Sequence, residues 1–479
     1  MYNHGIYIKE NPTKMARPTS VESAIQFVVG TAPINMTDGK VNELVLIHSY
    51  EEAIQKLGYS NDLQKFTLMQ SINACFEIFN VAPIVVVNVL DPQVHKAAVA
   101  EAIHPVLNKV IHIEEEGILL NENFIVKDET NTTTYEKDVD YTASFNLDGT
   151  LKIRLSDVLT DTSVSISYEQ LDPSLVTDDE VIGQYDTETE TYTGIQLAEL
   201  AFYTLGINVS TLLAPGYSHK KTVGQALTRK AKKISALFSA EALVDIDATT
   251  ATKYSDVAAE KLAMDIRDTY GVMLWPMLSR GGKRYAYSAL YGALLADTDD
   301  KNDGVPYVSA SNKALKVDAA VLSDGTEVFL TIEKANELNG NGIVTAINLL
   351  GWKSWGNNTS AYPEVDDPKD RFIPSRRMFN WWGNRFIRTY FEKVDSPMNL
   401  RLIEAIVDNE NVIANGYKSR YQIAEARIEF VQEDNPEWEL LDGNIRFNQI
   451  LTTFPPAKQI INTLEFNTNA LTTALFGGE

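Results

Sequence analysis

The stretch PIVVVNVLDP, residues 83–92, is the part of the sequence that decides the fold class. It runs through four consecutive β-branched residues, Ile84 to Val87, and ends with the turn-forming pair Asp91-Pro92. A short, uninterrupted apolar run with such an end is typical of a strand buried on both faces. The stretch therefore predicts a buried strand.

Two helices are predicted upstream of this strand. Ser49 and Glu52 have the spacing of a capping box, and Gly58 is suited to end the helix that they begin. Apolar residues then recur at helical spacing, which places Cys75 in the core rather than at a reactive site. These residues are Leu68, Ile72, Cys75, Phe76 and Phe79. The order helix, helix, strand favours an α/β fold.

Later parts of the chain repeat these patterns. Thr193 with Gln196, and Thr222 with Gln225, have the spacing of further capping boxes. Ser396 and Pro397 are suited to the N-cap and first position of a helix that would end at Asn415-Gly416. Apolar and alternating runs predict further strands at residues 272–275, 426–431 and 445–451.

The chain has 479 residues and a net charge of −23, and much of that charge lies in one region. Residues 114–190 contain 20 acidic and four basic side chains. Period-two alternation within this region, as in residues 151–155, predicts half-buried antiparallel strands. We therefore predict an inserted β domain at residues 111–192. Its acidic surface is either simply solvated or faces a partner of matching charge.

A second region is basic. Residues 371–401 contain seven basic and two acidic side chains, with aromatic residues between them. Such a pattern can bind single-stranded nucleic acid. It also fits an amphipathic helix whose aromatic face is buried and whose arginines face solvent or an acidic partner. The acidity of the whole chain favours the second interpretation and predicts no nucleic-acid partner.

Several classes of function are disfavoured. One cysteine excludes an internal disulfide framework, and no apolar run approaches the ~20 residues of a membrane span, so no membrane association is expected. The N-terminus lacks a signal-peptide pattern, which predicts a cytoplasmically made protein. Gly281-Gly282-Lys283 lacks the other residues of a phosphate loop, and residues 299–304 resemble a polar surface loop more than a calcium loop. No motif requires an enzyme, a metal or a cofactor.

Both ends of the chain contain short β-prone segments beyond prolines. Residues 5–9 are separated from the body by Pro12 and Pro18, and residues 458–467 by Pro455-Pro456. An isolated strand cannot satisfy its own backbone groups, so it either frays or adds to a sheet edge in another subunit. The predicted arm-strand residues are Ile6, Tyr7, Ile8, Ile460, Ile461, Leu464 and Phe466.

The order of several short motifs resembles one family over most of the chain. The motifs are His4-Gly5-Ile6-Tyr7-Ile8, Leu213-Ala214-Pro215-Gly216-Tyr217, Leu338-Asn339, Gly351-Trp352, Trp355-Gly356, Asn415-Gly416-Tyr417 and the proline-led C-terminal segment. The chain resembles the contractile tail sheath proteins of tailed phages and related injection systems such as R-type bacteriocins. The predicted β insertion is similar to a domain that some members of that family carry.

The resemblance implies a multidomain α/β (α+β) fold with a sheath-type core, an inserted antiparallel β domain and extended N- and C-terminal strand arms. The expected borders are 1–20 for the N-terminal arm, 21–110 for the first part of the core, 111–192 for the β domain, 193–358 for the α/β sheath domain, 359–455 for a C-terminal domain facing the tube, and 456–479 for the C-terminal arm.

The same resemblance implies a mechanical role without catalysis. Subunits would form six-membered rings stacked around a tail tube, and contraction from a metastable state would drive the tube through the target envelope. The implied partners are other copies of the chain, the tail tube protein, and baseplate and tail-terminator proteins, in a virion tail or injection particle assembled in the bacterial host cytoplasm. Arg385, Arg388 and Arg401 are candidates to face the tube. The alternatives are another virion or shell protein, or an α/β hydrolase with a β insertion.

Overall fold

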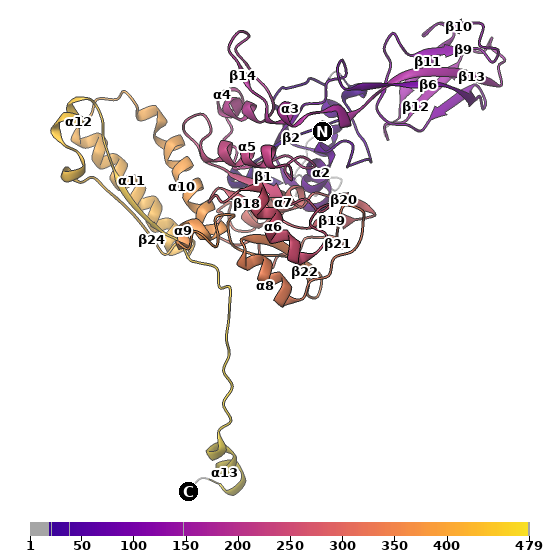
Figure 1. Ribbon diagram of the computed structural model, residues 1–479. Coiled ribbons are helices and arrows are strands. Elements are labelled where there is room, and N and C mark those ends of the chain that lie inside the picture. The colour runs from indigo at the N-terminus through magenta and orange to yellow at the C-terminus, as the bar shows by residue number, and fades with distance from the viewer. Residues whose placement is uncertain (1–18, 21, 38, 147, 478–479) are drawn as a thin grey trace, which may run out of the picture.

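The computed structural model describes residues 19–20, 22–37, 39–146 and 148–477. Its body contains an eight-stranded sheet whose central strands are buried (Figure 1). The strand order is β23 (Trp352–Trp355), β22 (Ile343–Asn348), β18 (Gly271–Leu274), β17 (Glu241–Asp245), β16 (Thr211–Leu213), β2 (Gln26–Gly30), β5 (Ile84–Asn88) and β3 (Val45–Ile47). The six inner strands are parallel and the two edge strands antiparallel, which gives the mixed α/β architecture.

The strand predicted at residues 84–87 is confirmed as β5, which lies between β2 and β3. The first predicted helix is confirmed as α1 (Tyr50–Leu57), where the Ser49 hydroxyl accepts a hydrogen bond from the Glu52 backbone N–H at 3.2 Å. Gly58 ends that helix with φ +76°, a conformation that costs glycine little. Local capping chemistry and apolar runs therefore locate this part of the fold correctly.

Helices cover the sheet in two groups. One group contains α5 (Lys221–Lys232), α6 (Tyr254–Met264) and α8 (Ile332–Gly340), which neighbour one another. The other contains α2 (Leu68–Ile72), its π-helical continuation Asn73–Phe79, and α7 (Tyr287–Asp300). Cys75 lies in this second group and is fully buried, as predicted, and burial raises the pKa of its thiol to about 12.

The antiparallel strands form a region that projects from the body and has its own core (Figure 1). Two small sheets contain β6 (Lys96–Pro105), β7 (Val110–Ile113), β8 (Ile118–Leu119), β9 (Ile125–Lys127), β10 (Thr134–Tyr135), β11 (Tyr141–Phe145), β12 (Leu151–Leu155) and β13 (Ser163–Leu171). The region begins before the expected border at residue 111, because β6 pairs with β13 along most of its length. After β13, α3 (Asp178–Ile182) already packs against α5.

The remaining elements differ from the sequence expectation in several places. Thr222, predicted to begin a capping box, is the second residue of α5 and donates to Asp178 at 3.0 Å instead of capping the helix. Thr193 does not cap a helix with its side chain; its hydroxyl accepts from the Gln184 backbone N–H at 3.0 Å. Helix α11 (Leu400–Ser419) begins three residues after the predicted position, because Asn399, not Ser396, is its N-cap and accepts from the Leu402 N–H at 3.0 Å.

The smaller elements complete the fold. The short helices are α4 (Ala201–Leu205), α9 (Pro368–Arg371) and α12 (Glu437–Leu441), and the short strands are β1 (Thr19–Ser20) and β4 (Val81–Ala82). The hairpins are β14–β15 (Tyr185–Asp186 and Thr191–Tyr192) and β19–β20 (Met277–Arg280 and Lys283–Tyr285), and β19 also pairs with β21 (Ala319–Val321).

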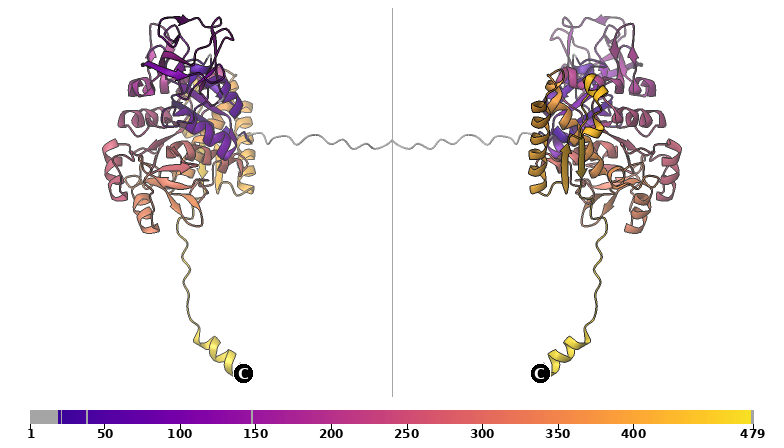
Figure 2. Two further views of the ribbon diagram at one scale, coloured as in Figure 1. Left: turned by 90° about the vertical axis from the view of Figure 1, so that its right-hand side faces the viewer. Right: turned by 90° about the vertical axis from the view of Figure 1, so that its left-hand side faces the viewer.

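The C-terminal region stands beside the body. Helix α10 (Ile373–Tyr390) connects to α11, and β24 (Glu425–Glu429) pairs with β25 (Asn448–Thr452). The chain then leaves the body as an extended segment that ends in a short helix, α13 (Thr468–Phe476), in all views (Figures 1 and 2). None of the helices in the described part of the chain has the length and hydrophobicity to cross a lipid bilayer.

Candidate assembly site in the C-terminal region

The β24–β25 hairpin is a sheet of only two strands. The strands pair antiparallel from Glu425 with Thr452 to Glu429 with Asn448. Within the described part of the chain, no third strand pairs with either of them. A two-stranded sheet is marginal by itself, and its outer edges present unpaired backbone groups. The hairpin is therefore a place where a strand from another molecule can add.

The two outer edges of this hairpin are not equivalent. On β24, the Asn411 side chain donates to the Ile428 carbonyl and accepts from the Ile428 N–H, both at 3.0 Å. This amide from α11 occupies the backbone groups that a strand beside β24 would need at that position. On β25, Ile450 is 55% exposed, and its neighbours alternate between exposed and half-buried. The β25 edge is thus the more open of the two.

A small apolar cluster holds the hairpin against α10 and α11. Its buried members are Val305, Met378, Trp382, Ala414, Ile423 and Ala426. The ring of Tyr417 packs edge-on against Trp381 and Trp382, with centroid distances of 5.4 and 5.5 Å. These contacts explain why α11 continues past the predicted stop at Asn415-Gly416: the packed Tyr417 ring keeps its last turn helical.

The three candidate tube-facing arginines do not form one cluster. Arg385 donates to both carboxylate oxygens of Glu410, at 3.1 and 2.5 Å, and joins α10 to α11. Its side chain is 16% exposed, whereas Glu410 is completely buried. Arg388 is exposed one turn further along α10 and, with Arg385, lines an open pocket of about 370 Å³. Arg401 is exposed in the first turn of α11.

The predicted arm residues fall into two groups. Ile6, Tyr7 and Ile8 lie outside the described residues. Ile460 and Leu464 are each 87% exposed, and Ile461 and Phe466 are exposed as well, in a segment without helix or strand. The predicted strand segment ends at Asn467, whose side chain accepts from the N–H groups of Asn469 and Ala470 and caps α13.

A buried ionic contact joins α10 to the body, and sequence reasoning missed it. Arg377 donates to both carboxylate oxygens of Asp299, at 3.0 and 2.7 Å, and both side chains are buried. The interpretation of residues 299–304 as a polar surface loop is wrong for Asp299, which is the penultimate residue of α7. The interpretation of the basic region as a helix whose arginines face acidic partners fits Arg377.

The described residues contain few features that suggest catalysis. They include no group of three or more His, Cys, Asp and Glu side chains arranged to hold a metal ion. Ser218, at the centre of Gly216-Tyr217-Ser218-His219-Lys220, is fully buried and donates to Asp245 at 2.7 Å. Asp245 also accepts from the Ser288 hydroxyl at 2.6 Å, so this polar group joins β17 to α7.

Comparisons with known proteins point to one family. No protein-family model matches the chain. The chain is 25% identical to the tail sheath protein of Burkholderia phage BcepMu over all of its own length and 99% of that protein. It is 26% identical to the tail sheath protein of Escherichia phage P2 over 58% of its own length and 68% of that protein.

Solved structures show the same fold. A chain of the anti-feeding prophage baseplate matches with a TM-score of 0.59 and 14% identity, over 97% of this chain and 99% of that one. The contracted sheath complex of PVC, an extracellular contractile injection system, matches with a TM-score of 0.57 and 15% identity, over 98% and 99%. Full-length similarity to one curated phage tail sheath protein, partial similarity to two others and the fold of injection-system sheaths all support the resemblance of the chain to the tail sheath family.

Proposed function

We propose that this protein is the structural subunit of a contractile tail sheath. Copies form six-membered rings that stack helically around a tail tube, and contraction from a metastable extended state drives the tube through the target envelope. The observation that carries the proposal is an open-edged β hairpin next to an exposed apolar segment in the same chain. The partners are other copies of the chain, the tube, the baseplate and a tail terminator, in a tail or injection particle assembled in the host cytoplasm.

Strand addition between copies of the chain accounts for both the open edge of the β hairpin and the exposed apolar segment. The segment that contains Ile460, Ile461, Leu464 and Phe466 exposes apolar side chains to solvent and makes no backbone ladder with the described residues. The β25 edge exposes backbone groups that lack a neighbouring strand. Pairing the segment of one copy with the hairpin of the next satisfies both, since main-chain hydrogen bonds supply affinity and side-chain pockets supply specificity. The N-terminal segment, with Ile6, Tyr7 and Ile8, acts in the same way.

Tethered subunits suit a contractile lattice. Backbone pairing tolerates rotation of the bodies that it links, so a subunit changes its packing while its tethers hold. Pro455-Pro456 stiffens the start of the C-terminal tether, because proline restricts the backbone to extended conformations. A free-energy difference of a few kcal/mol per subunit between the two packings is sufficient to drive contraction, since many subunits act together. Such a difference is small compared with the stability of a domain.

On the tube side, we assign the exposed cations of the C-terminal region. Arg388 and Arg401 present charge at the surface of α10 and α11. Arg385 contributes less there, because both ends of its guanidinium already bind Glu410. Charges at such a face set register and orientation more than they add affinity.

Deletion of each arm tests the proposal. A chain without residues 456–479 should remain a folded monomer with an unchanged thermal transition, because residues 457–477 are exposed. A chain without residues 1–18 should also remain a folded monomer. Neither should form the hollow striated cylinders that the full chain forms in negative-stain microscopy. Removal of residues 477–479 alone is the control and should leave the cylinders intact. Long cylinders from either arm-deleted chain would contradict the arm model.

A further inference from the structure

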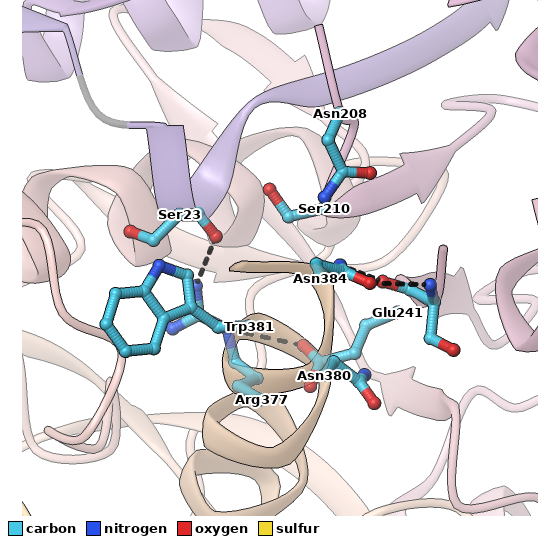
Figure 3. Close-up of a pocket in the computed structure, with 9 residues that line it drawn as sticks. Ser23, Asn208, Ser210, Glu241, Arg377, Asn380, Trp381 and Asn384 are labelled. Carbon is cyan, nitrogen blue, oxygen red and sulfur yellow. Dashed lines mark hydrogen bonds and ion pairs between the residues drawn. The ribbon is translucent and has the colours of Figure 1, made fainter. Parts of the chain in front are cut away.

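The middle of α10 contacts the body through polar side chains. Asn384 on α10 donates to the Ser239 carbonyl at 2.7 Å and accepts from the Ser239 N–H at 3.0 Å. Asn380 donates to the Ala240 carbonyl at 3.3 Å, and Arg377 binds Asp299. These contacts surround Glu241, the first residue of β17 (Figure 3). The C-terminal region is therefore joined to the sheet through a buried polar layer, which we call the α10 seam.

Glu241 is the unsatisfied member of this seam. Its carboxylate lies 3.3 Å from Nε of Arg377, and the side chain is 3% exposed. Neither of its carboxylate oxygens has a hydrogen-bond donor among the described residues. The two terminal nitrogens of Arg377 are directed to Asp299 instead. One guanidinium thus serves two buried carboxylates and satisfies only one of them.

The charges around Glu241 do not balance. Arg377 is the nearest cation, and the next one, Arg376, already pairs with Asp370 at 3.0 Å. Asp299 adds negative charge from α7, and Tyr291 of the same helix is buried nearby. A buried ion without full pairing is costly, so the neutral form of such a group is favoured. Burial raises the pKa of Glu241 to about 8, although Arg377 and Arg376 oppose the shift.

A small cavity gives the acid form somewhere to donate. Its volume is about 20 Å³, which is room for a single water, and it lies between α10 and the residues that precede β16 and β17 (Figure 3). Glu241 lines it, as does Asn208, whose buried Oδ1 atom has no hydrogen-bond partner among the described residues. The Oδ1 atom of Asn208 and the carboxyl group of Glu241 therefore line the same polar cavity, and neither has a hydrogen-bond donor among the described residues.

We propose that Glu241 is a proton-binding site of the α10 seam, and that its carboxylic acid form, which donates a hydrogen bond into this cavity, is the resident form at neutral pH. Loss of that proton would leave the seam with two carboxylates and one guanidinium. The attachment of the C-terminal region to the sheet is then strongest when Glu241 is protonated. This inference concerns one chain alone and does not depend on the proposed assembly.

The proton on Glu241 determines how the stability of the folded chain changes with pH. In the unfolded chain, Glu241 ionises near the ordinary value of 4.5, whereas in the folded chain it keeps its proton to about pH 8. Between these values the folded state binds the extra proton, so the stability contribution of Glu241 is full below about pH 4.5 and falls as pH rises to about 8. Above about pH 8, Glu241 is ionised in both the folded and the unfolded chain, and the loss of stability no longer changes with pH.

The Glu241→Gln variant of the full chain tests this, because glutamine mimics the neutral acid and cannot titrate. The variant should melt at the wild-type temperature near pH 4.5 and above it by roughly 2–4 °C at pH 8–9. A lower melting temperature than wild type at pH 8, or an equal difference at every pH, would overturn the proposal, since both indicate an ionised Glu241. Asp299→Asn is the contrasting variant and should destabilise the chain at every pH, because it weakens the bidentate contact with Arg377.

Infrared spectroscopy on the wild-type chain gives a second measurement that does not require a folded variant. A buried protonated carboxyl group has a carbonyl stretch separate from that of carboxylates. We expect this band at pH 7 and its loss as pH rises through about 8. Its absence at pH 7 would overturn the assignment of the proton. The assignment would also be overturned if the band changed when sodium was replaced by a large organic cation at fixed pH. In that case a metal ion, not a proton, would compensate the charge of Glu241.

Discussion

Two arginines from the same basic stretch of sequence occupy different environments. Arg385 holds the buried Glu410 with two hydrogen bonds, and its guanidinium lies 4.7 Å from the ring centroid of Trp382. Gln449 of β25 also donates to Glu410, at 3.4 Å. Arg401, by contrast, is exposed at the start of α11. Arg385 therefore stabilises the C-terminal region, whereas Arg401 is available at its surface.

Substitutions at these positions should separate the two roles. Glu410→Ala should lower the stability of the C-terminal region by about 3–5 kcal/mol, because it leaves the partly buried Arg385 without its acceptor. Arg401→Glu should leave thermal unfolding nearly unchanged and weaken assembly around tubes. Thermal unfolding and cosedimentation with tubes measure the two effects. Strong destabilisation by Arg401→Glu, or none by Glu410→Ala, would contradict this division.

The sequence alone does not identify ion pairs between residues that are far apart in the chain. Helical spacing predicted that arginines of the basic region would face solvent or an acidic partner, and Arg377 and Arg385 do bind acidic residues. The partners themselves could not be named, because Asp299 is 78 residues away from Arg377 and Glu410 is 25 away from Arg385. Nothing in the local pattern of residues 299–304 marks Asp299 as buried.

At the scale of single elements, local patterns were reliable where the chemistry is local. The apolar run at residues 84–87 became β5, and Ser49 caps α1. Errors arose where several residues could cap the same helix. Ser396 and Asn399 both have side chains of a type that can accept from a backbone N–H, and only the backbone path decides between them. In the structure Asn399 has an extended conformation, with φ −133° and ψ 164°, and its oxygen reaches the N–H of Leu402.

This choice of cap can be measured. Asn399→Ala should cost about 1 kcal/mol, since it removes the acceptor from the first turn of α11. Ser396→Ala is the matched control and should be close to neutral, because that residue lies before the helix. Urea unfolding of the full chain gives both values. A larger loss from Ser396→Ala would indicate that α11 begins at the position predicted from sequence.

At the scale of the whole molecule, the antiparallel region and the body have separate cores. The core of the region is made of residues between Ile111 and Tyr168, whereas the body has its own cluster around the eight-stranded sheet. The links between them include hydrogen bonds and apolar contacts: Asn35 donates to the Ile118 carbonyl at 2.9 Å, Ser60 and the Asn61 N–H donate to Glu116, and Leu119 and Leu171 pack on the body. The alternation in β12 predicted such a region from sequence, but its start at β6 was missed because residues 96–105 do not alternate in the same way.

The strand register shows how the region can be removed. Ala97 of β6 lies opposite Gln170 of β13, so the chain enters and leaves the region at neighbouring positions. Replacing residues 98–169 by Asn-Gly should close the two ends as a hairpin, because that pair favours the two-residue turn that joins antiparallel strands. The body should stay folded, since its sheet and helices keep their own core and lose the links at Asn35, Ser60, Asn61 and Leu119.

Differential scanning calorimetry of the shortened chain should show one unfolding transition fewer than the full chain, with the main transition lowered by a few degrees. The lowering comes from the lost burial of Leu119 and the lost acceptor of Asn35, each worth about 1–3 kcal/mol. The arms and the β24–β25 hairpin are unaffected, so the shortened chain should still form cylinders in negative-stain microscopy. An insoluble chain, or loss of the main transition together with the region, would show that the two cores depend on one another and fold as one unit.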